Sequence, residues 1–135
     1  MFYVCCRLDF CYGHRLLNHA GKCRFLHGHN GRAEITVGGE QLNSFGMVMD
    51  FADIKRDIKV WIEDHLDHRM ILHNDDPAVP WMRSQEEPVY VVSFNPTAEN
   101  IARHIYEQAL AKGIPVQRVR LWETPKCHAT FQAKG

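Results

Sequence analysis

Two runs in which apolar residues recur at every second position, each next to histidine, most constrain how this chain can fold. Apolar side chains occupy every second position of residues 2–12, and residues 29–38 repeat the pattern. Alternation with period two is typical of a strand with one buried face. His27 and His29 open the second run at the same spacing, so both imidazoles are expected on one side of a strand. If the two strands pair antiparallel, His14 at the end of the first run arrives beside them.

Three imidazoles brought together in this way favour a zinc site. Neutral imidazole is a preferred zinc ligand, and three protein ligands with an open fourth position are typical of a catalytic zinc. Cys23 allows a second interpretation, because its thiolate would complete the tetrahedron and give a closed, structural site. The spacing alone leaves three interpretations: an open zinc site, a closed zinc site, and no metal site, with the histidines on the surface and the cysteine in the core.

Composition limits the classes of protein that this chain can belong to. Its 135 residues are 45% hydrophobic, which suits one domain over residues 1–135. Sixteen basic residues balance sixteen acidic ones, so no basic field favours nucleic acid. Five irregularly spaced cysteines argue against a disulfide framework, and no apolar run has the length of a membrane span. We expect a cytoplasmic protein that binds a small molecule, with neither nucleic acid nor a membrane as partner.

The remaining pattern predicts two helices and a hairpin. Apolar residues recur at helical spacing after Asp50, the expected N-cap, and again after Asn95 or Thr97. The expected elements are a helix from Phe51 to about Leu66, a helix from Ala98 to about Ala109, and strands over 116–122 and 128–132, with 73–95 a loop apart from an extended piece at 89–92. The order strand, strand, helix, helix, strand, strand predicts an α+β domain with a four-stranded antiparallel sheet and both helices on one face.

The histidine and cysteine spacing resembles a known signature. Phe10-x-x-x-His14 followed by Cys23-x-x-x-His27-Gly28-His29 is similar to the zinc motif of the 6-pyruvoyltetrahydropterin and 6-carboxytetrahydropterin synthase family. Three further phrases resemble that family: Leu66-Asp67-His68, Pro96-Thr97-Ala98-Glu99 and Trp122-Glu123-Thr124. The resemblance spans about residues 5–132. Two departures are Tyr12, where the family usually has a small residue, and the longer segment 73–95.

The resemblance implies a role for each matching residue. In that family three histidines hold zinc and the cysteine stays off the metal as an acid/base, which favours the open site. The residues implied are His14, His27 and His29 as zinc ligands, Cys23, Asp67 and His68 as proton-transferring groups, Glu123 as the acceptor for the pterin ring, and Thr97 at the pterin pocket. The acidic partner is expected to orient the imidazole of His68 and raise its basicity.

The resemblance also implies an assembly and a reaction. The family has the tunnelling fold, in which subunits join their sheets into a barrel with active sites at subunit boundaries, so we expect a homo-oligomer, a hexamer. Its substrate is a small molecule, 7,8-dihydroneopterin triphosphate, and its cofactor is zinc. Two activities share the motif. One gives 6-carboxytetrahydropterin with loss of acetaldehyde and triphosphate, for queuosine and related deazapurines, and the other gives 6-pyruvoyltetrahydropterin, for tetrahydrobiopterin.

The spacing of Cys23 favours the first activity. Three residues separate Cys23 from His27, which looks like the short gap of bacterial carboxy-forming members, whereas animal pyruvoyl-forming members have a longer one. The 6-carboxytetrahydropterin synthase reaction is therefore the expected one, and the pyruvoyl reaction is the alternative. A third hypothesis is a structural-zinc interaction module without chemistry, in which Cys23 closes the site and its thiol no longer alkylates.

Overall fold

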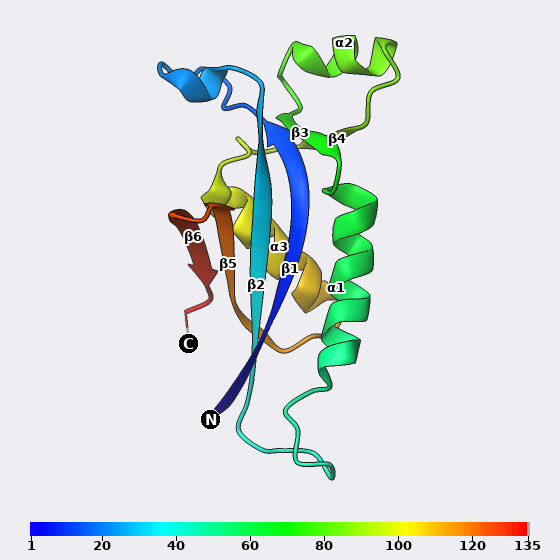
Figure 1. Ribbon diagram of the computed structural model, residues 1–135, viewed down its shortest axis with the longest axis vertical. Coiled ribbons are helices and arrows are strands. Elements are labelled where there is room, and N and C mark those ends of the chain that lie inside the picture. Colours follow the sequence, from blue (N-terminus) through cyan, green and yellow to red (C-terminus); the bar gives the residue numbers. More distant parts are fainter. Residues whose placement is uncertain (135) are drawn as a thin grey trace.

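A mixed sheet of six strands forms the framework of the protein, in the order β4-β3-β1-β2-β5-β6 (Figure 1). The computed structural model describes residues 1–134, so Gly135, the last residue of the expected domain, lies outside the described residues. The elements are β1 (Phe2–His14), the 3-10 turn η1 (Lys22–Arg24), β2 (His27–Gly39), α1 (Phe51–His65), β3 (Arg69–His73), α2 (Ala78–Ser84), β4 (Val89–Val92), α3 (Ala98–Ala111), β5 (Val116–Thr124) and β6 (Cys127–Gln132).

The two histidine-bearing strands pair antiparallel, as the alternation predicts. Phe2 lies opposite Gly39 at one end of the β1–β2 ladder, and His14 lies opposite His27 at the other. Both long helices and the C-terminal hairpin are confirmed. Asp50 caps α1 by accepting a hydrogen bond from the backbone N–H of Ala52 at 2.8 Å, which satisfies a donor that the first helical turn leaves free.

The predicted four-stranded antiparallel sheet is wrong in its number of strands and in their directions. β3 and β4 extend the sheet beyond β1, and both pairings, β1 with β3 and β3 with β4, are parallel. Strands of this kind are covered on both faces and carry continuous apolar runs, so Met70-Ile71-Leu72 has no alternation that would identify it from sequence. The extended piece expected at 89–92 is β4.

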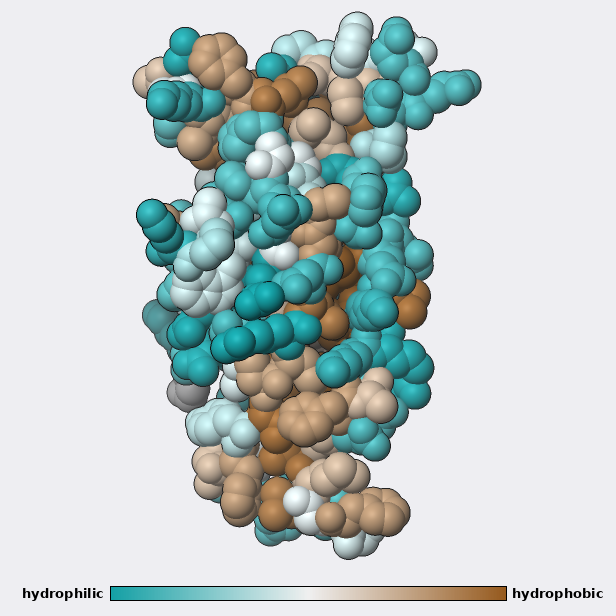
Figure 2. Space-filling model, viewed as in Figure 1, coloured by the Kyte–Doolittle hydropathy of each residue, from teal (hydrophilic) through white to brown (hydrophobic). Residues whose placement is uncertain are grey.

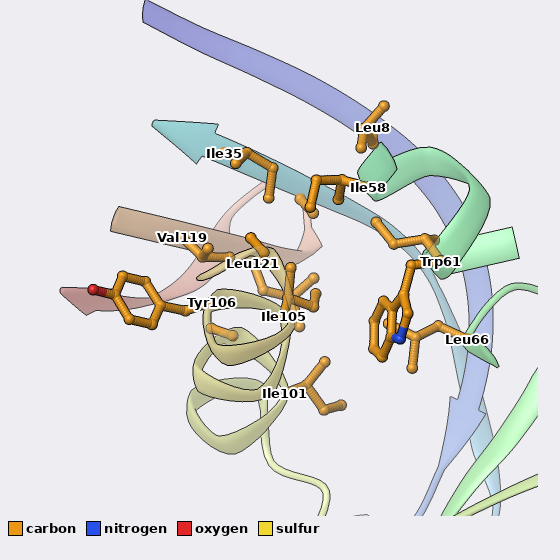
Figure 3. Close-up of a cluster of buried hydrophobic side chains, with 14 of the residues drawn as sticks. Leu8, Ile35, Ile58, Trp61, Leu66, Ile101, Ile105, Tyr106, Val119 and Leu121 are labelled. Atoms are coloured by element: carbon orange, nitrogen blue, oxygen red, sulfur yellow. The ribbon is translucent and has the colours of Figure 1, made fainter. Parts of the chain in front are cut away.

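The two predicted helices lie on one face of the sheet, as expected, and a third helix, which was not predicted, lies on the other face. α1 and α3 pack on the same face, where Ile58 and Ile105 meet the β2 residue Ile35 in the main core (Figure 3). The shorter α2, within the segment expected to be loop, packs on the opposite face of β3 and β4. Its Val79 and Met82 form a second, smaller cluster there with Leu72. None of the helices in residues 1–134 is both long enough and apolar enough to cross a membrane.

A buried ion pair fastens the end of β1 to the segment that contains α2. The Asp76 side chain is fully buried, and its carboxylate accepts hydrogen bonds from Nε of Arg15 at 2.7 Å and from Nη2 of the same guanidinium. Asp76 also accepts from the backbone N–H of Ala78 at 2.8 Å, at the start of α2. The guanidinium of Arg15 is the main cause that holds the pKa of Asp76 below its usual range, and it outweighs the effect of burial.

We predict that Asp76→Ala lowers the free energy of unfolding by about 3 kcal/mol near neutral pH, because it leaves the Arg15 guanidinium without its partner. This value is at the lower end for a buried pair, since Arg15 remains 24% exposed. Urea denaturation at one protein concentration measures it. The native pKa of Asp76 is depressed, so its contribution is complete above the unfolded pKa of about 4 and is lost as the pH falls through the native pKa.

The neighbouring Asp75 supplies the control, because its side chain is 80% exposed. Asp75→Ala is expected to change the unfolding free energy by less than about 0.5 kcal/mol. If the two variants are equally stable, or if the difference between wild type and Asp76→Ala grows as the pH falls below about 4, the ion pair does not have this role.

Candidate metal centre and the residues around it

Three histidines converge at the end of the β1–β2 ladder. Because directly paired residues share a face, the pairs His14–His27 and Tyr12–His29 place all three imidazoles on the face of the sheet that α1 and α3 cover. One ring nitrogen from each histidine lies within 4.8 Å of the others. The Nε2 atoms of His14 and His29 are 3.1 Å apart. The arrangement expected from the His-x-His spacing is therefore present in the folded chain.

Backbone carbonyls orient two of these imidazoles. Nδ1 of His14 lies 2.7 Å from the Pro96 carbonyl oxygen, just before α3, and Nδ1 of His27 lies 2.7 Å from the carbonyl oxygen of Phe25. An Nδ1–H that donates to a carbonyl fixes the tautomer and leaves the lone pair of Nε2 free, which is the usual outer shell of a metal-binding histidine. The structure thus prepares the Nε2 atoms as ligands.

Burial keeps two of the rings neutral. His14 is 3% exposed, and burial lowers the pKa of both His14 and His29 below the ordinary value, outweighing the opposing effect of the Glu123 carboxylate. Neutral imidazole is the form that coordinates a metal. These two side chains therefore do not have to lose a proton at neutral pH before they bind.

A carboxylate and a phenol adjoin the histidine group. The Glu123 carboxylate on β5 lies 3.8 Å from Nε2 of His14 and 3.7 Å from Nε2 of His29. The Tyr12 hydroxyl donates to Oε1 of Glu123 at 3.4 Å, and burial is the main cause that raises the pKa of Tyr12, so it remains a donor. The ring of Tyr12 packs edge-on against His14, with centroids 5.2 Å apart. The bulky residue that departs from the family pattern thus holds Glu123 beside the ligands.

The donor set suits zinc. Three imidazole nitrogens from rigid strands provide the ligand type and the count of a zinc site with an open position. Cys23 does not belong to the group of donors within 4.8 Å of one another in residues 1–134. It lies in η1, where its backbone carbonyl accepts from the N–H of Leu16 at 2.8 Å. The described residues therefore bring the three imidazoles together without Cys23, and the open site stays the predicted one.

The predicted Asp67–His68 pair is formed, on the other side of the sheet. Oδ2 of Asp67 lies 3.0 Å from Nδ1 of His68, in the turn between α1 and β3. Oδ1 of Asp67 accepts the backbone N–H of Cys11 at 3.0 Å, and Cys11 alternates with Tyr12 and therefore faces away from the helices. Burial alone would raise the pKa of Asp67, but the hydrogen bonds from His68 and Cys11 hold it below the usual range. Asp67 is thus an anionic acceptor.

The cysteine beside this pair is Cys11, whereas the sequence predicts Cys23 as the partner of Asp67 and His68. Sγ of Cys11 lies 3.7 Å from Oδ1 of Asp67, and the group of donors within 4.8 Å comprises Cys11, Asp67 and His68. Cys23 is absent from that group among the described residues. Cys11 was overlooked because its contact with Asp67 spans 56 residues of sequence, and no local pattern reports such a contact.

Thr97 acts as the N-cap of α3, accepting the backbone N–H of Asn100 at 3.1 Å. This capping alone accounts for its residue type. Thr97 directly follows Pro96, whose carbonyl orients His14, so the start of α3 adjoins the histidine group. Its assignment to a pterin pocket remains a prediction.

Two hollows adjoin the Asp67–His68 pair, of about 720 and 540 Å³. Cys11 and His68 line both, and the larger also includes Trp122. The smaller is lined by His27 and His29 as well as His68, so it connects residues of the histidine group with the Asp–His pair. Both volumes fall in the range of small-molecule sites.

Fold and site together define an α+β protein whose sheet presents a set of three imidazoles equipped to hold a divalent transition metal. The comparisons with known proteins specify it further. A family model described as 6-pyruvoyl tetrahydropterin synthase matches residues 3–134. The chain belongs to this family.

Curated relatives and solved structures agree with that membership. The chain is 39% identical over 128 residues to a 6-carboxy-5,6,7,8-tetrahydropterin synthase of Rickettsia typhi, covering 90% of this chain and 93% of the relative. It is 36% identical over 124 residues to the protein of that name from Aquifex aeolicus, covering 82% and 76%. An uncharacterised protein of Wolinella succinogenes superposes with a TM-score of 0.81 at 27% identity, over 98% of both chains. The 6-pyruvoyl tetrahydropterin synthase of Caenorhabditis elegans gives 0.72 at 26%, over 98% and 96%.

Proposed function

We propose that this protein is a zinc-dependent lyase that converts 7,8-dihydroneopterin triphosphate to 6-carboxy-5,6,7,8-tetrahydropterin, with loss of acetaldehyde and triphosphate. The observation that carries the proposal is the group of three imidazoles from His14, His27 and His29, of which His14 and His27 direct Nδ1 at a backbone carbonyl and leave Nε2 to coordinate. The names of the curated relatives, at up to 39% identity, support the carboxy-forming reaction over the pyruvoyl-forming one. The short gap between Cys23 and His27 supports the same choice.

The three histidines would hold the zinc from one strand end. Bound there, zinc supplies a Lewis acid that polarises hydroxyl and carbonyl groups of the substrate side chain. The sheet fixes the three imidazoles relative to one another, because two of them are also hydrogen-bonded to backbone carbonyls. Such fixed geometry contributes to rate by placing the reacting carbons at a set distance from the proton carriers.

Glu123 would bind the amino-pyrimidinone edge of the pterin. A carboxylate that accepts two N–H bonds fixes a planar ring in one orientation. In the free protein the Glu123 side chain is directed at His14 and His29, with Tyr12 as its hydrogen-bond donor. Binding the ring therefore requires the carboxylate to turn away from the imidazoles, while its position on β5 beside the metal ligands keeps the ring near them.

Proton transfer would fall to Cys23 and to His68, oriented by Asp67. The anionic carboxylate of Asp67 accepts from Nδ1 of His68 and leaves Nε2 to exchange protons with substrate. The side chain of His68 is 80% exposed, so a ligand can reach it. Cys23 lies between Lys22 and Arg24 in the 3-10 turn η1.

The position of Cys23 supports a homo-oligomeric active site. Within one chain, Cys23 is not among the donors within 4.8 Å of Asp67 and His68. β4 and β6 form the open edges of the sheet, and pairing of such edges between subunits would join sheets into the barrel of the tunnelling fold. A hexamer in which one subunit supplies Cys23 and a neighbour supplies the Asp67–His68 pair would complete the catalytic set.

Zinc-loaded protein incubated with 7,8-dihydroneopterin triphosphate is expected to yield 6-carboxytetrahydropterin and acetaldehyde. Mass spectrometry follows the pterins, and an enzymatic assay follows acetaldehyde. Cys23→Ala should lower kcat by at least about 100-fold, because it removes a proton carrier, while zinc stays bound. His27→Ala should lose both zinc and turnover.

Cys5→Ala is the matched control, since Cys5 is exposed and belongs to neither group of donors; it should keep wild-type turnover. A pyruvoyl product without acetaldehyde would favour the alternative activity. No turnover in protein that retains its zinc would contradict both reactions and favour the interaction module.

Mixing two inactive variants tests the shared site. If Cys23 and His68 act from different subunits, assemblies re-formed from equal amounts of Cys23→Ala and His68→Ala should recover about a quarter of the wild-type activity, because random association leaves that share of sites intact. Each variant re-formed alone is the control and should stay inactive. No recovery in mixed assemblies that contain both chains would place Cys23 and His68 of each site in one subunit.

A further inference from the structure

A second cluster of metal-binding side chains lies on the face of the sheet opposite the three histidines. The Cys11 thiol, the Asp67 carboxylate and the His68 imidazole each offer a donor atom, and these three atoms lie within 4.8 Å of one another. The cluster shares no residue with the group of His14 and its neighbours. It also differs in chemistry, since it combines sulfur, oxygen and nitrogen, whereas the other group has nitrogen alone.

Backbone hydrogen bonds hold the three side chains together without a metal. The N–H of Cys11 donates to Oδ1 of Asp67 at 3.0 Å, and the N–H of His68 donates to the Cys11 carbonyl at 2.8 Å. His68 has φ +59°, a left-handed conformation that is uncommon for a residue other than glycine. The turn after α1 is thus fixed against β1 in a conformation that places the imidazole and the thiol beside one carboxylate.

The observed separations approach those of a tetrahedral site. Zinc bonds of roughly 2.0–2.3 Å place neighbouring donor atoms roughly 3.3–3.8 Å apart. Sγ of Cys11 is 3.7 Å from Oδ1 of Asp67, which already meets this requirement. The other carboxylate oxygen, Oδ2, lies 3.0 Å from Nδ1 of His68, so the carboxylate would bind the cation through both oxygens or rotate to present one of them, and the proton shared with His68 would leave.

The cluster is open to solvent. His68 is 80% exposed at its side chain, and Asp67 is 28% exposed. Both hollows described above include Cys11 and His68 in their lining. Viewed from this side, hydrophilic side chains gather across the middle of the sheet, while hydrophobic ones occupy the end where β2 leads to α1 (Figure 2). A cation can therefore enter from water and keep a solvent ligand at its fourth position.

We propose that Cys11, Asp67 and His68 form a second metal site, which takes a thiophilic divalent cation such as Zn²⁺ or Cd²⁺. A thiolate and a carboxylate neutralise the charge of the cation, whereas the three neutral imidazoles leave it at +2. Because thiolate ligands select softer metals, Cd²⁺ is expected to prefer this site to the three-histidine group.

Occupancy of the second site has a regulatory consequence, which rests on the proposed function. Coordination by Asp67 and His68 would withdraw both groups from proton transfer. Zinc beyond the first equivalent would then inhibit turnover, although the first equivalent is required for it. The binding of the second metal does not depend on the enzyme activity, so the two claims can fail separately.

Titration of metal-free, assembled protein with Cd²⁺ or Co²⁺ tests the binding directly. We expect about two equivalents per chain and a thiolate-to-metal charge-transfer band in the ultraviolet. Cys11→Ser should lose one equivalent and the band together. His27→Ala should lose the other equivalent and keep the band. Cys5→Ser is the matched cysteine control, because Cys5 is exposed and belongs to neither group of donors, and it should keep both equivalents and the band.

Several outcomes would overturn the second site. One equivalent in wild-type protein, or a band that survives Cys11→Ser, means that Cys11 binds no metal. A band lost in Cys23→Ser assigns the metal-bound thiolate to Cys23 and not to Cys11. If two equivalents bind as expected but excess Zn²⁺ leaves turnover unchanged, the second metal site is correct and the predicted inhibition is wrong. If no turnover occurs under any condition, the proposed function is wrong, and the metal-binding result is not affected.

Discussion

The register between β1 and β2 is the constraint on which the rest of the site depends. Its last pair sets His14 against His27, and the pair two positions earlier sets Tyr12 against His29. A slip of one residue would turn one strand over, moving its histidines to the opposite face and its apolar residues out of the core. The buried side chains along the ladder, including Ala33, Ile35 and Val37 at 0% exposure, therefore fix the position of the imidazoles as well as the fold.

The same sheet separates two kinds of chemistry. On the helix-covered face, burial keeps His14 and His29 neutral, and carbonyls before α3 and β2 direct the rings. On the open face, Asp67 stays ionised through hydrogen bonds from Cys11 and His68. A substrate that contacts both the three histidines and the Asp67–His68 pair must reach past the strand ends, which agrees with the proposal that the catalytic residues come from neighbouring subunits.

Local patterns in the sequence predicted the parts of the fold that local physics determines. Alternation identified β1 and β2, and capping chemistry identified Asp50 and Thr97, because each depends on residues a few positions apart. The strand β3 was not predicted, since a strand buried on both faces lacks alternation, and β4 was predicted only as an extended piece at 89–92 and not as part of the sheet. The helix α2 was not predicted either, because the Arg15–Asp76 ion pair that fixes its start joins residues 61 positions apart in the sequence. In the site, the histidines were predictable from spacing, whereas the contact of Cys11 with Asp67 was not.

We propose that His14, His27 and His29 hold a zinc ion whose remaining position stays open. X-ray absorption at the zinc edge measures this directly, on Cys11→Ser protein loaded with one zinc per chain so that only the three-histidine group is occupied. We expect a first shell of nitrogen and oxygen at about 2.0 Å that changes when the pterin triphosphate is added. A sulfur neighbour at about 2.3 Å would contradict the claim, because it would place Cys23 on the metal and close the site.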